Sequence, residues 1–167
     1  MPVQDADLFG IIEKLGNHYK NNINNRFLRK VLYSLPLDRV TRECIDDITD
    51  TSSFRKVQGF TFEELYERIL ALAQFVSIVR RDIVPHIRSL TAGDQNTLFT
   101  GKSQSSDDVL KNMAISNFAT NIDILSDLVN ELYLKTVALD KEAHPNTPTV
   151  YSRFPELKNL GELLVRK

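Results

Sequence analysis

The stretch from Thr61 to Leu90, TFEELYERILALAQFVSIVRRDIVPHIRSL, decides the fold. It opens with a T-x-x-E capping box, in which the Thr61 oxygen accepts a first-turn amide and Glu64 reaches back to the cap. Behind the box, core-type side chains recur at alternating steps of four and three, which keeps them on one face of a helix about 45 Å long. They are Leu65, Ile69, Leu72, Val76, Val79, Ile83, His86 and Leu90. The pattern predicts one long amphipathic helix over 61–90, with His86 at the edge of the core.

A second long helix is predicted over 106–139. Ser105 to Asp108 supply cap oxygens and negative charge at the positive end of its dipole. Its central apolar stripe is Ala114, Phe118, Ile122, Leu125, Val129 and Leu132, with Ile115, Ile124, Leu128 and Tyr133 on the flanks. Because this apolar arc covers about half of the circumference, the helix should contact neighbours on several sides, as the central helix of a bundle does. Asn121 falls inside the arc and needs a hydrogen-bond partner there.

The remaining elements follow from the same periodicity. Shorter N-terminal helices are expected at about 5–20, 24–34 and 37–48, and a long polar loop at 91–105 joins the two long helices. A proline-containing connection at 140–155 leads to a C-terminal helix at 156–166. We therefore predict an all-α protein, a single-domain helical bundle over 1–167 with two long antiparallel helices.

The composition is that of a folded globular protein. The chain has 167 residues, of which 42% are hydrophobic and 26% charged, and its formal net charge is −1. This balance gives no global attraction to nucleic acid or to an anionic membrane. Cys44 is the single cysteine, which rules out an intrachain disulfide and fits a reducing compartment. No leader peptide or membrane-spanning apolar run is visible, so we expect a cytoplasmic protein.

Metal and cofactor motifs are incomplete. Thr100 to Ser103 read TGKS, the end of a phosphate-binding loop, but Asn96 stands where that motif requires glycine. The histidines, His18, His86 and His144, lack the spacing of metal ligands on helices. The acids Asp123, Asp127 and Glu131 read as a solvated helix face, with Glu131 and Lys135 as an i,i+4 pair. We expect no metal and no cofactor.

The hexapeptide RDIVPH, from Arg81 to His86, resembles the R-x4-H motif of HEPN ribonucleases, a family of small all-helical domains. The resemblance implies metal-independent RNA cleavage by Arg81 and His86. A structural explanation competes with it. Residues five apart lie about 140° apart around a regular helix, which leaves Arg81 in solvent. Pro85 cannot donate a hydrogen bond to the Arg81 carbonyl, so the helix is expected to kink there. We favour the kink.

A local basic patch gives a further alternative. Arg26, Arg29 and Lys30 share one predicted helix face and favour a weak, salt-sensitive nucleic-acid-binding module. The acids Asp46, Asp47 and Asp50 follow closely and reduce the positive field, and no recognition-helix signature accompanies the patch.

The leading hypothesis is a non-enzymatic helical protein-protein interaction or assembly protein. Its partner would be another protein or a second copy in a homodimer, with no role for a membrane. The C-terminal helix is the element expected to make this contact, because it follows a proline-containing tether. Leu157, Leu160 and Leu164 are the predicted partner-binding or swapped face. The alternative, which we favour for these leucines, is that they dock onto their own bundle.

Overall fold

The computed structural model describes residues 3, 5–23, 33, 38–39, 60–86 and 117–164. The predicted loop 91–105, almost all of the predicted helices at 24–34 and 37–48, and the first part of the helix predicted from 106 lie outside these residues. Within them the elements are helical and no strand occurs, as predicted. None of the helices in these ranges is apolar over a length that would cross a membrane.

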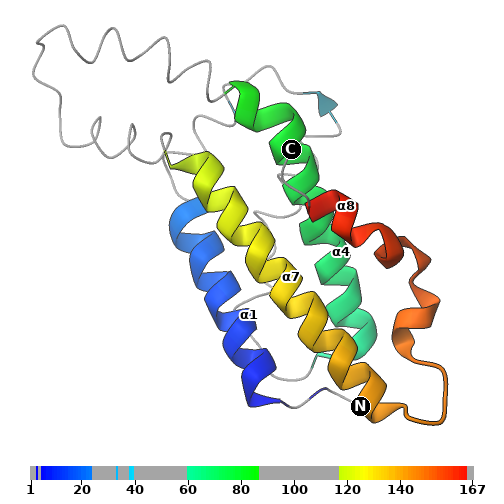
Figure 1. The fold of residues 1–167 in the computed structure, drawn as a ribbon. Helices are drawn as coiled ribbons and strands as arrows, with labels where there is room; N and C mark the ends of the chain where they lie inside the picture. The colour runs from blue at the N-terminus through cyan, green and yellow to red at the C-terminus, as the bar shows by residue number, and fades with distance from the viewer. Residues whose placement is uncertain are drawn as a thin grey trace, which may run out of the picture.

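Three α-helices form the body of the fold (Figure 1). They are α1 (Ala6–His18), which runs on into the π-helical turn η1 (Tyr19–Ile23), α4 (Phe62–Ile78) and α7 (Phe118–Ala143). α7 packs against both α1 and α4. The apolar side chains of all three helices share one buried cluster, so α7 occupies the central position predicted for it.

Contacts between the ends of the helices give the topology. The end of α1 meets the start of α7, where His18 Nε2 lies 2.7 Å from the Asn121 carbonyl oxygen. Tyr66, near the start of α4, bonds Asp140, near the end of α7. Arg80, just after α4, bonds Asp123 near the start of α7. α7 therefore runs antiparallel to both neighbours, and the predicted antiparallel pair of long helices is confirmed.

The capping box of α4 forms as predicted. The Glu64 amide donates to Thr61 Oγ1 over 3.2 Å, and the Thr61 amide donates to Glu64 Oε1 over 3.2 Å. All of the predicted stripe from Leu65 to Ile83 is buried. The helix thus begins where the sequence places it and turns the expected face inward.

The helix does not keep α geometry up to Pro85. Residues Val79–Ile83 form a π-helical turn, η3, and the Val84 amide donates to the Val79 carbonyl. α-Helical geometry resumes through His86, so the irregularity precedes the proline. A π turn holds one extra residue, which rotates the following side chains by roughly 100° relative to a regular helix. His86 is consequently exposed and Val84 is buried, so the prediction that His86 lies at the core edge is wrong.

α7 extends to Ala143, beyond the predicted end at Leu139. The predicted stripe from Phe118 to Leu132 is buried, and Thr136 and Asp140 continue it. The connection therefore begins at His144 and not at residue 140. Ala114 and Ile115, the first predicted core residues of this helix, lie outside the described residues.

The chain then returns along α7 as three short elements. We call Val150–Leu164 the C-terminal segment; it comprises the 3-10 turns η4 (Val150–Arg153) and η5 (Pro155–Asn159) and the helix α8 (Leu160–Leu164). The single helix predicted over 156–166 is wrong in this respect, because its first turn is 3-10. These elements contact α4 and α7, and Figure 1 shows α8 beside α4.

Candidate functional site

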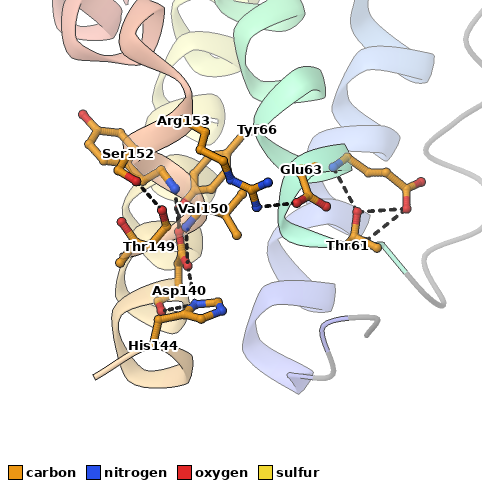
Figure 2. Close-up of polar contacts among 11 residues, drawn as sticks. Thr61, Glu63, Tyr66, Asp140, His144, Thr149, Val150, Ser152 and Arg153 are labelled. Atoms are coloured by element: carbon orange, nitrogen blue, oxygen red, sulfur yellow. Dashed lines mark hydrogen bonds and ion pairs between the residues drawn. The ribbon is translucent and has the colours of Figure 1, made fainter. Parts of the chain in front are cut away.

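The most organised polar group in the described residues is the carboxylate of Asp140, which is fully buried on α7. It accepts two hydrogen bonds on each oxygen (Figure 2). Oδ1 lies 2.8 Å from His144 Nδ1 and 3.1 Å from the Val150 amide. Oδ2 lies 2.7 Å from the Tyr66 hydroxyl and 2.9 Å from the Tyr151 amide. Every acceptor position of the carboxylate is thus in use.

Three elements bring these donors together. Tyr66 comes from the first turns of α4, and His144 stands one turn after Asp140 as the C-cap of α7. Val150 and Tyr151 open the 3-10 turn η4, where the first amides have no acceptor within the turn. The preceding residue, Thr149, makes no side-chain cap. Asp140 therefore caps η4 from the neighbouring helix.

The surroundings fix the charge of this group. Burial on its own would raise the pKa of Asp140, but hydrogen bonds from Tyr66, the Tyr151 and Val150 amides and His144 outweigh burial and lower it. Burial raises the pKa of Tyr66, and the bond to the Asp140 carboxylate raises it further. At neutral pH the aspartate is ionised and the tyrosine keeps its proton. A carboxylate with four donors has no free position from which to act as a general base.

A cluster of aromatic rings surrounds Tyr66, the side-chain donor to Asp140 from α4. The Tyr66 ring lies 5.9 Å from the Tyr151 ring and 5.5 Å from the Phe154 ring, measured between centroids. The Tyr133 hydroxyl donates to the Tyr151 hydroxyl over 2.9 Å. Burial and this bond raise the pKa of Tyr133. These contacts hold Tyr151 between Tyr66 of α4 and Tyr133 of α7.

A second polar contact holds the other end of the segment. Arg80 in η3 donates through one guanidinium nitrogen to the Leu164 carbonyl over 2.7 Å, and through another to Asp123 Oδ1 over 2.6 Å. Ser126 Oγ donates to the same carbonyl over 3.1 Å. The cation thus meets the main chain of Leu164, the last described residue of α8. We refer to the Asp140 end and the Arg80 end of the segment.

The apolar side chains between these two ends are the leucines singled out from the sequence. Leu157, Leu160 and Leu164 are buried in the main core cluster of their own chain. This is the arrangement that the sequence analysis favoured for them. A surface patch made of these three residues is therefore covered in the described structure.

Arg81 and His86 do not come together. The Arg81 guanidinium makes two hydrogen bonds of 2.8 Å to the carboxylate of its neighbour Asp82, and these bonds raise its pKa. Both Arg81 and His86 are exposed, and no contact joins them in the described part of the chain. Arg81 faces solvent as predicted from the helical spacing.

The other residues considered as ligands have structural partners. His18 Nδ1 lies 3.0 Å from the Asn22 side-chain nitrogen and its Nε2 lies 2.7 Å from the Asn121 carbonyl oxygen, so the ring links the end of α1 to the start of α7. Lys135 lies 3.9 Å from Asp5 and 3.8 Å from Asp7, and not against Glu131 as predicted. Over the described ranges, no group of three metal-ligating side chains converges.

Three sequence motifs lie outside the described residues. They are the basic residues Arg26, Arg29 and Lys30, the TGKS stretch at 100–103 and Cys44. Comparison of the chain with protein-family models, with curated proteins and with solved structures found no match.

Proposed function

We propose that this chain is a non-enzymatic helical interaction or assembly protein that recognises an amphipathic helical segment. The recognising part is the surface of α4, η3 and α7 that the C-terminal segment covers, which we call the receiving surface. The observation that carries the proposal is the way in which this segment is held. It lies against the body as a separate element, with polar contacts at both ends and three leucines between them.

The chemistry of the receiving surface supports recognition rather than catalysis. Asp140 bonds main-chain amides and Arg80 bonds a main-chain carbonyl, so both select a backbone conformation. Apolar contact provides the remaining affinity, as in other helix-binding proteins. The single Cys44 and the near-neutral charge support a cytoplasmic location for such a protein.

The test is binding of a labelled peptide of sequence 150–164 to the full-length chain in which Leu160→Asp weakens the internal segment. We expect micromolar binding by fluorescence anisotropy. The unmodified chain should bind at least tenfold more weakly, because its own segment competes at an effective concentration on the order of millimolar.

A peptide carrying Leu157→Asp and Leu160→Asp is the matched control and should not bind. Glu162→Lys, an exposed change in the same helix, should leave the chain as closed as the unmodified protein. If the Leu160→Asp chain keeps its helical circular dichroism and still fails to bind the unmodified peptide, the receiving surface is not a recognition site.

A further inference from the structure

We propose that the natural occupant of the receiving surface, besides the chain's own segment, is the C-terminal segment of a second copy. Two chains would exchange Val150–Leu164 and form a symmetric swapped dimer. This inference rests on the proposed function and names its partner. It follows from three features of the described residues: the contacts of the segment, its connector and its short helices.

The polar contacts that fix the segment join it to the body. Asp140 receives the Val150 and Tyr151 amides, and Arg80 and Ser126 both bind the Leu164 carbonyl. Arg153 adds an exposed pair with Glu63 of α4. Each of these contacts forms equally well when the segment comes from another chain, so the exchange conserves them.

The connector is suited to opening. Residues 145–148, with the sequence PNTP, are exposed, and they lie between the end of α7 and the start of η4. Each proline favours an extended backbone at the residue before it, here His144 and Thr147. The bond between His144 and Asp140 belongs to the body and need not break. Extension of the connector would therefore cost few contacts.

The segment cannot remain folded when it is free. From Val150 to Asn159 it forms two 3-10 turns, η4 and η5, and 3-10 turns have poorer hydrogen-bond geometry than an α-helix and need packing partners. A detached segment would also expose Leu157, Leu160 and Leu164, so it must find an equivalent surface. A second copy offers every partner group that the segment has in its own chain, and this favours it over an unrelated protein.

The connector length decides between the two forms. A short connector gives the internal segment an effective concentration on the order of millimolar, so the closed monomer should dominate at micromolar protein. A connector too short to reverse direction would remove the closed form. Without residues 145–148, Val150 would follow Asp140 by only six positions, about 9 Å further along a continuing helix, and could not return to it.

The test is sedimentation velocity of the full-length chain lacking residues 145–148, at about 10 μM. We expect twice the monomer mass, and monomer for the unmodified chain. Adding Leu160→Asp to the deletion should restore the monomer, because the exchanged segment then loses its central anchor. A deletion variant that keeps cooperative unfolding and sediments as a monomer overturns the exchange.

A second measurement decides the matter if the deletion variant does not fold. It mixes two full-length variants, one with a damaged surface (Arg80→Ala with Asp140→Ala) and one with a damaged segment (Leu157→Asp with Leu160→Asp). The mixture should give a 1:1 heterodimer in which the intact segment covers the intact surface. A mixture that stays monomeric overturns the exchange. If the 150–164 peptide nevertheless binds, the proposed function survives while its partner assignment fails.

Discussion

The two ends of the C-terminal segment are held by opposite chemistry. At the Asp140 end a buried anion accepts hydrogen bonds from four donors, one of them the hydroxyl of Tyr66 in an aromatic cluster. At the Arg80 end a cation reaches the Leu164 carbonyl from a site with partial access to solvent, since the Arg80 side chain is 16% exposed and that of Asp123 is 36% exposed. A buried charge is costly when any partner is missing, whereas water can replace part of an exposed contact. The Asp140 end should therefore be the less tolerant of change.

The largest effect is expected from Asp140→Ala. The change leaves the Tyr66 hydroxyl and the Val150 and Tyr151 amides without their acceptor, and each buried unsatisfied donor costs about 1–3 kcal/mol. We expect the free energy of unfolding to fall by about 3–4 kcal/mol in urea titrations. Glu142→Ala, an exposed change two positions along the same helix, is the control. A loss below about 1 kcal/mol for Asp140→Ala would remove the distinction between the two ends.

Acid should lower the free energy of unfolding through Asp140 by less than Asp140→Ala does, because protonation leaves the side chain in place. The folded-state pKa of Asp140 lies below that of an unfolded aspartate, about 3.9. Its stabilising contribution is therefore complete above about pH 4 and is lost as the pH falls through the folded-state pKa. Urea midpoints between pH 7 and pH 2.5 should fall more steeply for the unmodified protein than for Asp140→Asn. Parallel curves would contradict this assignment.

Arg80→Ala tests the other end and should cost about 1–2 kcal/mol, because a charged donor to a carbonyl is lost while Ser126 still binds Leu164. Arg81→Ala is the matched control. Its guanidinium pairs with the adjacent Asp82 at the surface, so the change should leave the free energy of unfolding close to that of the unmodified chain. Equal losses for Arg80→Ala and Asp140→Ala in the same urea experiment would show that burial does not separate the two ends.

The smallest effect is expected from a contact that lies between the two ends of the segment. Arg153 and Glu63 form a 2.6 Å ion pair whose side chains are 63% and 47% exposed. Arg153→Ala should change the free energy of unfolding by no more than about 0.5 kcal/mol, since exposed pairs are weak. The thermal midpoint in low and high salt checks this, and a large salt-dependent loss would mean that the pair anchors the segment.

The long helices could be predicted from local sequence, since each stripe and cap depends on residues three or four apart. Thr61 with Glu64 and the stripe from Leu65 to Ile83 are of this kind. The position of His86 could not be predicted, because the π turn shifts a periodicity that the sequence pattern assumes to be constant.

The candidate site was missed for a different reason. The Tyr66 hydroxyl is 74 positions away from Asp140 in the sequence, and two of the other donors are main-chain amides that no motif records. One signal was available. Leu132, Thr136 and Asp140 continue the buried stripe of α7 at steps of four, so an aspartate on that face required partners.

The bonds from Asp140 to main-chain amides have an evolutionary consequence. An amide is present at residues 150 and 151 whatever side chains stand there, so sequence drift at these positions leaves the contact intact and is limited by packing alone. Proline is the exception, because it has no N–H to donate. Related chains should therefore vary at both positions and exclude proline from them wherever an aspartate stands at position 140.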